Sequence, residues 1–371
     1  AYAHIGSPGY MLASYIGVMY QNRALNGGGI AAIAGSQGGA QIDLFATDPN
    51  HPVGIAQNRA YSKGGGVYLI PYISTEGSGA LPVNEATLKM EGVLIDDNAS
   101  PEGSGIYADT DWTFAFVYEA PAGGEVYMYA GADCASAGCN SVSNNRSVTL
   151  DSQGHDVPTA GSAILMQTDG ALSANRLVMR GNEGAHAIRV ADGLHLPLSL
   201  DTCLLAGNTV TAELATFGSA STTINQCTFA GNSIGGPSVM YAETGFTMTN
   251  SIIAQGALST LHYVGSGAGR AIDYVMAQET ATLNLGATHL FNADPLFVDV
   301  ANGDFHLRAD SDAIDVAPPV AGDDRDLDNR PRDQDMPNVP NLDGDRDLGA
   351  YERQVHLCAS DTIFCDGFDA N

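Results

Sequence analysis

The chain has 371 residues, of which 42 are acidic and 15 are basic, and its formal net charge is −27. This charge repels nucleic acids and anionic membranes, and it disfavours polyanionic glycans unless calcium or a local basic patch intervenes. The 44 glycines and the 15% of charged residues are typical of a turn-rich globular chain rather than a disordered one.

The opening stretch, residues 1–20, is apolar and strand-like. It begins at Ala1 without a methionine, and no apolar run in the chain reaches the roughly 18 residues that a membrane-spanning helix needs. We therefore expect a processed, exported protein with no membrane-spanning segment.

An apolar residue, two variable positions and an asparagine recur along the chain as a repeat. The repeated asparagines are Asn22, Asn58, Asn98, Asn145, Asn182, Asn208 and Asn232. Glycine-rich clusters at residues 27–29, 64–66 and 103–105 follow several copies and lead into apolar residues. Glycine tolerates the positive φ of tight corners, so the pattern indicates a strand, a corner and another strand.

The period of the repeat is clearest in the second half of the chain. Spacings of 24 residues separate Cys203 from Cys227, Asn208 from Asn232, and Cys227 from Ser251. Strands of successive coils stack at about 4.8 Å, so stacked asparagines can bond the corner backbone and one another. We interpret the asparagines as structural and predict an all-β chain that folds as a right-handed parallel β-helix over residues 1–290.

The earlier copies are further apart, with asparagine spacings of 36, 40, 47 and 37 residues. Either some coils lack the asparagine or loops are inserted between strands. In solenoids such insertions gather on one face and often carry binding. We therefore expect loop insertions and function in the N-terminal half, and a first coil with an uncapped edge.

One insertion is predicted as a β-hairpin over about residues 107–140, because aromatic residues alternate on both sides of a turn at residues 121–124. These aromatic residues are Trp112, Phe114, Phe116, Tyr118, Tyr127 and Tyr129. Such a row suits stacking on sugar rings or packing against a partner protein. The alternative is that the row packs on the flank of the solenoid.

The six cysteines form three neighbouring pairs. The pairs are Cys134 with Cys139, Cys203 with Cys227, and Cys358 with Cys365. Even pairing predicts disulfides and an oxidising compartment. For Cys203 and Cys227 the alternative is that both are small buried core residues.

Carboxylates recur at alternate residues in two runs near the C-terminus. They are Asp324, Asp326, Asp328, Asp343, Asp345 and Asp347. This spacing lets a loop wrap oxygen ligands around Ca²⁺, although neither run completes an EF-hand loop. The alternative pairs these aspartates with neighbouring arginines on a solvated loop.

Four blocks near the C-terminus carry a family resemblance. They are Asp-Pro-Leu-Phe-Val-Asp (294–299), Gly-Asp-Phe-His-Leu-Arg (303–308), Ser-Asp-Ala-Ile-Asp (311–315) and Asp-Leu-Gly-Ala-Tyr-Glu (347–352). Together with the asparagine and Gly-Gly-Gly-Ile repeats, they resemble secreted bacterial β-helix proteins of the choice-of-anchor (Q-type) family. The repeats are also similar to those of polymorphic outer-membrane adhesins. The resemblance implies export to the cell surface or medium and a C-terminal cap over residues 291–371, with an acidic loop and a disulfide-closed tail.

Three groups of residues could carry catalysis. They are Asp96 with Asp97, His155 with Asp156, and Glu183 with His186 and Arg189. Glycan-cleaving enzymes of this fold use paired carboxylates, or an Arg or Lys base with calcium. None of the three groups matches a catalytic signature, so we assign no catalytic residue.

Two hypotheses about function follow. The first is a non-catalytic structural or adhesive module that binds surfaces or neutral glycans, or that associates head to tail with copies of itself through its uncapped end. The second is a glycan-cleaving enzyme, a polysaccharide lyase or glycoside hydrolase of the pectin-lyase-like fold.

Overall fold

The computed structural model of the chain describes residues 2–4, 9–13, 18–34, 39–46, 48, 51–73, 83–109, 124–131, 134, 139–167, 170–191, 197–256, 258–265, 269–278, 289–319 and 324–354. For residues 2–4, 9–13, 72–73 and 83–84 the backbone alone is described. Within these ranges the secondary structure is almost entirely strand, and it includes a short 3₁₀ helix, η3 (Val300–Asn302).

The largest sheet, sheet 2, has 17 strands arranged in two columns. Its first column holds β2 (Gly9–Ala13), β6 (Ala40–Phe45), β12 (Ala86–Glu91), β16 (Gly124–Met128), β21 (Ala171–Asn175), β25 (Leu198–Asp201) and β29 (Thr222–Asn225). Its second column holds β3 (Val18–Tyr20), β7 (Val53–Ala56), β13 (Val93–Asp96), β17 (Asn140–Ser143), β22 (Leu177–Arg180), β26 (Leu204–Ala206), β30 (Thr228–Ala230) and β36 (Leu290–Phe291). Two long strands cross both columns, β33 (Phe246–Ala254) and β35 (Arg270–Ala277).

Two further sheets complete the coils. Sheet 3 holds β4 (Arg23–Asn26), β8 (Arg59–Lys63), β14 (Ala99–Ser100), β18 (Arg146–Leu150), β23 (Glu183–Gly184), β27 (Thr209–Val210) and β31 (Ser233–Ile234), with β19 (Asp156–Pro158) antiparallel to β18. Sheet 1 holds β1 (Tyr2–His4), β5 (Ile30–Ile33), β9 (Val67–Ile70), β15 (Ile106–Ala108), β20 (Ser162–Met166), β24 (His186–Val190), β28 (Ala215–Thr216), β32 (Ser238–Ala242) and β34 (Ser259–Tyr263). Two small antiparallel pairs are β10 (Tyr72–Ile73) with β11 (Val83–Asn84), and β37 (Phe297–Asp299) with β38 (Asp304–Leu307).

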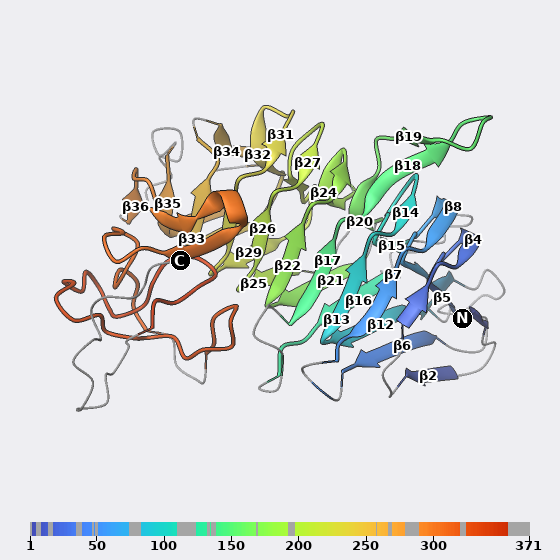
Figure 1. Cartoon of the computed structure of the whole chain (residues 1–371), viewed down its shortest axis with the longest axis horizontal. Coiled ribbons are helices and arrows are strands. Elements are labelled where there is room, and N and C mark those ends of the chain that lie inside the picture. The colour runs from blue at the N-terminus through green and yellow to red at the C-terminus, as the bar shows by residue number, and fades with distance from the viewer. Residues whose placement is uncertain are drawn as a thin grey trace.

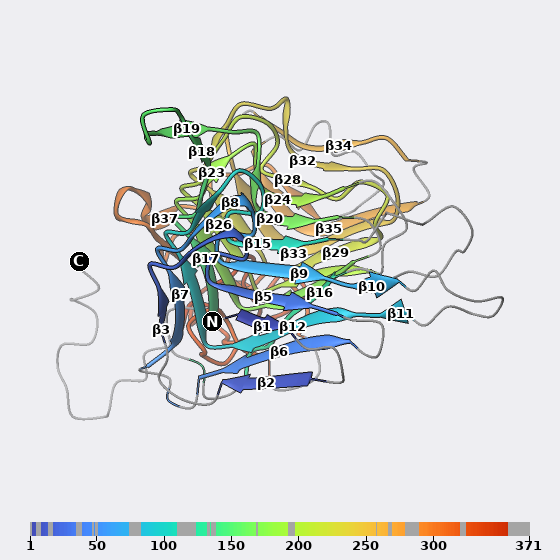
Figure 2. The ribbon, with the colours of Figure 1, turned by 90° about the vertical axis from the view of Figure 1, so that its right-hand side faces the viewer.

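Each coil runs through both columns of sheet 2, then sheet 3, then sheet 1, as β6, β7, β8 and β9 do in turn. Successive coils pair in parallel and in register, so that Leu200 lies beside Ile224 and Ile224 beside Met248. Figure 1 shows the coils side by side along the molecule, and Figure 2 shows them stacked. The predicted parallel β-helix is confirmed, and a right-handed sense is the rule for parallel strands joined by crossovers.

The interior of the solenoid is a column of apolar side chains. Ile42, Leu88, Val126 and Leu172 occupy one register position in four successive coils, and each is at most 1% exposed. Burial of one such side chain stabilises the fold by about 1.5–3 kcal/mol. Alternate residues of these strands point outward, as the period of two requires.

The asparagines form the predicted ladder. The side-chain amide of Asn182 donates to the carbonyl of Val142 (2.8 Å) and to Oδ1 of Asn208 (2.9 Å), while its Oδ1 accepts from the backbone N–H of Asn145 (3.0 Å). The same bonds link every repeated asparagine to the next, from Asn22 to Asn232. The structural interpretation of the repeat is therefore confirmed.

In the first coil, β3 pairs with β7 and β4 with β8 and neither pairs with a second described strand, whereas β5 lies between β1 and β9. Its outward residues include Val18, Tyr20 and Leu25, which are 63%, 49% and 69% exposed. The uncapped edge expected at this coil stays a prediction.

The structure differs in part from the inserted hairpin predicted for about residues 107–140. β16 pairs in parallel with β12 and β21, so it is a coil strand and not the second strand of a hairpin. The reason is that Val126 and Met128 point inward and complete the apolar column. Residues 110–123, which include the other predicted strand, lie outside the described residues.

The segment predicted as a C-terminal cap covers the side of the late coils. Figure 1 shows this segment, orange to red, next to β33. Its apolar residues pack on outward-facing residues of the second column of sheet 2. The packed cluster is Val178, Leu204, Ala206 and Ala230 of the coils with Phe305, Leu327, Ala350 and Tyr351 of the segment. The backbone N–H of Gly349 also donates to the carbonyl of Asn250.

The cysteine pairs have different outcomes. Cys134 and Cys139 form the predicted disulfide. Cys203 and Cys227 are free, buried thiols, so the disulfide prediction is wrong for them and the core alternative holds. They directly precede strands β26 and β30, which pair in register. Cys358 and Cys365 lie outside the described residues.

Candidate functional site: an arginine cleft

Arginines gather at one register position of sheet 3, the residue directly after each ladder asparagine. Arg23 pairs with Arg59, Arg59 with Ala99, and Ala99 with Arg146. Like charges on adjacent strands repel, so the Arg23–Arg59 pair is unfavourable on its own. Ala99 is small, and it leaves space between the arginines on either side of it.

The residue directly before each ladder asparagine lies at a corner with positive φ. In the first four copies it is Gln21 (55°), Gln57 (55°), Asp97 (48°) and Asn144 (55°). In the last three copies it is glycine, at Gly181, Gly207 and Gly231. A side chain in this conformation costs about 1 kcal/mol or more relative to glycine, so the early coils keep polar side chains here at a loss of stability.

A second corner of the coil shows what such side chains do. Arg176 (φ 52°) and Gln226 (φ 53°) lie there, and they donate to Asn329 (2.9 Å) and Asp324 (3.1 Å) of the C-terminal segment. At the asparagine corner, Gln21 and Gln57 are exposed instead. There the amide of Gln21 donates to Oε1 of Gln57 (3.2 Å).

The hairpin of β18 and β19 adds a carboxylate and a histidine. Its turn is closed by Asp151, whose Oδ1 accepts from the backbone N–H groups of His155 (2.9 Å) and Gln153 (2.8 Å), and these bonds lower the pKa of Asp151. The hairpin places Asp156 against two arginines. Asp156 Oδ1 lies 2.6 Å from Nη2 of Arg59, and Oδ2 lies 2.9 Å from Nη1 of Arg146.

These residues line two adjoining hollows of about 400 and 360 Å³, which share Arg23 and Arg59. We call them together the arginine cleft. Its lining residues are Gln21, Arg23, Gln57, Asn58, Arg59, Asp97, Ala99, Arg146, Leu150, Gly154, His155 and Asp156. Three arginines and two aspartates make it locally positive on a chain whose net charge is −27. The local charge of the cleft is thus opposite in sign to that of the whole chain.

The cleft unites some of the residues considered for catalysis. Asp97, His155 and Asp156 line it, and Asp97 lies 3.7 Å from Arg146. Asp96 is turned to Asn144, whose amide donates to its Oδ1 (2.8 Å).

The third catalytic candidate group is divided between two sheets. Glu183 lies in sheet 3, whereas His186 and Arg189 lie on β24 of sheet 1. The ring Nδ1 of His186 lies 2.7 Å from the carbonyl of Glu213, and burial lowers the pKa of His186.

The aromatic row predicted for sugar stacking is described for two residues. Tyr127 and Tyr129 lie on β16 and directly after it, with ring centroids 6.3 Å apart and planes 13° apart. They belong to the first column of sheet 2 and not to the arginine cleft. Trp112, Phe114, Phe116 and Tyr118 lie outside the described residues.

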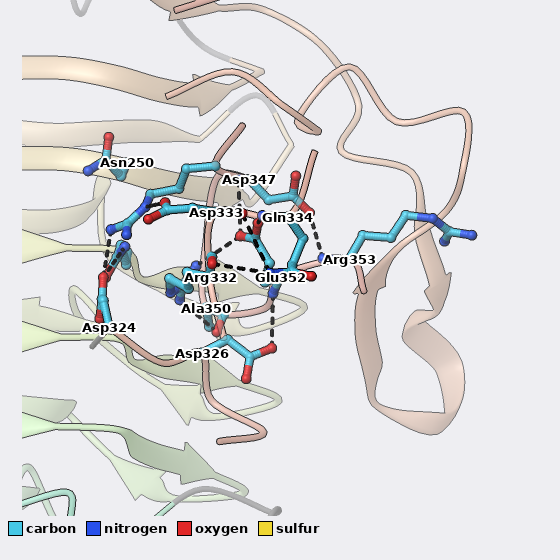
Figure 3. A network of polar contacts seen from close by, with 12 residues as sticks. Asn250, Asp324, Asp326, Arg332, Asp333, Gln334, Asp347, Ala350, Glu352 and Arg353 are labelled. Atoms are coloured by element: carbon cyan, nitrogen blue, oxygen red, sulfur yellow. Dashed lines mark hydrogen bonds and ion pairs between the residues drawn. The ribbon is translucent and has the colours of Figure 1, made fainter. Parts of the chain in front are cut away.

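Three of the aspartates predicted to bind calcium, Asp324, Asp326 and Asp347, belong to a polar network between the C-terminal segment and the coils (Figure 3). Fully buried Arg346 contacts Asp324 and Asp333 at 2.6 Å each. Asp326 accepts from the backbone N–H groups of Arg330 (2.8 Å) and Glu352 (3.1 Å). The network is buried at Arg346 and Asp326, unlike the solvated loop considered as the alternative.

Among the other predicted ligands, Asp328 and Asp343 each contact a histidine. Asp328 is 2.8 Å from His306, and Asp343 is 3.3 Å from His289. Asp345 is half-buried, and burial raises the pKa of Asp347 to about 7.

A different residue set meets the geometric requirement for a metal site. Among the described residues, Glu91, Cys134 and Cys139 form such a set, because their potential ligand atoms all lie within 4.8 Å of one another. Its two cysteines form the disulfide. Calcium binding by the acidic runs stays a prediction.

A lysine of sheet 3, Lys63, pairs with a fully buried tyrosine of sheet 1, Tyr107. Lys63 Nζ donates to the hydroxyl of Tyr107 (2.6 Å) and lies 3.5 Å from Asp109. Burial alone would lower the pKa of Lys63, but these two partners raise it above its ordinary value. A protonated lysine is a poor general base, so this pair does not supply one near neutral pH.

No protein-family model, curated protein or solved structure matches this chain. The resemblance to the choice-of-anchor family therefore stays a prediction. Within the described part of the chain, no helix has the length and apolar character to cross a bilayer.

Proposed function

We propose that this protein is a non-catalytic, extracellular or cell-surface β-helix that binds glycans, and that the arginine cleft is its binding site. One observation carries the proposal. Three arginines and two glutamines line a solvent-open hollow of an otherwise acidic chain, and the two glutamines lie at corners where glycine would be less strained.

The side chains of the cleft suit the groups that a sugar presents. Gln21 Nε2 donates to Oε1 of Gln57 (3.2 Å) and to the hydroxyl of Tyr20 (3.2 Å), which leaves Oε1 of Gln21 and Nε2 of Gln57 for the hydroxyl groups of a sugar. Arginine adds planar sets of N–H donors for hydroxyls and for acidic substituents. The cleft also lies in the looped N-terminal half, where the sequence predicts binding.

The enzyme alternative has weaker support in the same cleft. Both oxygens of Asp156 contact guanidinium groups, so this carboxylate positions Arg59 and Arg146. His155 faces Asp151, with Nδ1 3.3 Å from Oδ2, and its side chain is 71% exposed. These contacts favour a binding role for the cleft over acid–base catalysis.

A glycan array followed by calorimetry with the retained glycans tests the proposal. We expect binding that Arg59→Gln abolishes and Arg189→Gln leaves unchanged, because Arg189 is an exposed arginine of sheet 1, outside the cleft. The same glycans are then incubated with the protein and assayed for new reducing ends and unsaturated products. Cleavage would show that the enzyme alternative is correct and the non-catalytic function is wrong. An array that retains no glycan would refute both.

A further inference from the structure

The structure shows a carboxylate held within the arginine cleft. Asp156 comes from the β18–β19 hairpin and lies between Arg59 and Arg146, with one oxygen on each guanidinium group at 2.6 and 2.9 Å. Two strand spacings separate these arginines, and Ala99 of the intervening strand leaves room for the carboxylate. The protein thus carries an internal example of how this column of arginines holds an acid group.

Arg23 continues the column by one strand, beside Arg59. It is exposed, and within the described ranges no ion pair involves it. Both hollows of the cleft reach Arg23 and Arg59. Because Arg23 and Arg59 pair on adjacent strands, about 4.8 Å apart at the backbone, one acid group can contact both guanidinium groups and relieve their mutual repulsion.

We propose that the Arg23–Arg59 pair is an anionic subsite that binds the carboxylate of a uronic acid residue in the glycan. This inference rests on the proposed function and names the chemical class of its ligand. Arg59 contributes N–H groups that Asp156 does not use, since a guanidinium has five. Gln21 and Gln57 flank the pair and are placed to bond the hydroxyls of the same sugar.

The charge of the whole chain sets how many acid groups the ligand can carry. A polyuronate would meet the field of a protein with a net charge of −27 along its whole length. A single acid group in the cleft meets local positive charge, and salt screens the rest beyond about 10 Å. The preferred ligand is therefore a largely neutral glycan with isolated uronic acid residues.

The subsite is tested with two small probes, methyl β-D-glucuronide and methyl β-D-glucoside, which differ in a carboxylate. Binding is followed by ligand-observed NMR and calorimetry on the full chain. We expect the glucuronide to bind wild type and to bind Arg23→Gln about tenfold or more weakly, because a charge-assisted contact is lost. Arg189→Gln changes the net charge equally and should leave binding unaltered.

A second variant should change the glucuronide affinity in the opposite direction. Asp156→Asn frees Arg59 and Arg146 from their internal carboxylate, so glucuronide binding should strengthen several-fold, by about the reverse of the Arg23 effect. Glucoside binding should not change in either variant. A gain of affinity cannot arise from misfolding, and a thermal unfolding scan checks that each variant is folded.

Three results would overturn the subsite. They are equal binding of the two probes to wild type, equal losses in Arg23→Gln and Arg189→Gln, and a glucuronide affinity that Asp156→Asn leaves unaltered. If wild type retains neutral glycans in the array while the glucuronide gives one of these results, the subsite fails and the proposed function stands. If the array retains no glycan, the proposed function fails, whatever the monosaccharide probes show.

Discussion

Replacement of Asn182 by alanine removes a central rung of the asparagine ladder. The side chain is 1% exposed and makes four hydrogen bonds: two from its amide, to Val142 and Asn208, and two to its Oδ1, from the backbone and side chain of Asn145. At about 1 kcal/mol net for each bond, Asn182→Ala should lower the free energy of unfolding by about 4 kcal/mol. The buried N–H of Asn145 and the carbonyl of Val142 would each lose a partner, so the loss cannot be much smaller.

Asn22 is the matched control, because it is the first rung. Its side chain makes one hydrogen bond within the ladder, to Oδ1 of Asn58 (3.0 Å). Asn22→Ala should therefore lower the free energy of unfolding by about 1 kcal/mol.

Urea unfolding followed by circular dichroism measures both losses, and hydrogen exchange reports on single amides. In Asn182→Ala, exchange should speed up most at the amide of Asn145. Equal destabilisation by the two variants, or an unchanged exchange rate at Asn145, would refute the assignment of the ladder as the element that locks one coil to the next.

The other predictions concern pH, redox state, association and calcium. Burial raises the pKa of Glu352 to about 8. The protonated carboxyl therefore stabilises the folded state, and this stability is lost as the pH rises from the pKa of Glu352 in the unfolded chain through 8. Urea midpoints should decline between about pH 5 and pH 8, and Glu352→Gln should flatten this decline. The double variant Cys134→Ser, Cys139→Ser should lower the free energy of unfolding by about 2 kcal/mol, and equal urea midpoints with and without reductant in wild type would contradict this. Head-to-tail association through the first coil should appear in sedimentation velocity as a size that grows with concentration, and Leu25→Asp should remove it; a concentration-independent monomer in wild type rejects the idea. Calcium should raise the melting temperature of wild type but not of Asp345→Asn, and an unchanged wild type would exclude calcium at the acidic runs.

Much of the fold could be predicted from local features of the sequence. The asparagine repeat predicts parallel coils, because an asparagine at a corner satisfies its amide only if another lies directly above or below it. The disulfide between Cys134 and Cys139 is also predicted locally, because the short loop between the two cysteines keeps them close together. The same local reasoning placed Tyr127 in a hairpin, because alternation alone does not distinguish a coil strand from a hairpin strand.

The sequence carries a signal for the arginine cleft in the residues that follow the asparagines. Three of the first four ladder asparagines are followed by arginine, and none of the last three is. Once the asparagines are accepted as stacked, the residues after them must form a column as well. Arg23, Arg59 and Arg146 could have been placed together on that basis.

Other parts of the site depend on contacts between residues far apart in the chain. Asp156 reaches Arg59 across 97 residues because the β18–β19 hairpin folds back over sheet 3. The side of the late coils is covered because Val178 and Leu204 face outward and need apolar partners, which the C-terminal segment provides. The sequence by itself determined the coil and its ladder, since these follow from a repeated local pattern. Tertiary structure alone decided the charge balance of the cleft, since it depends on which distant acid meets which arginine.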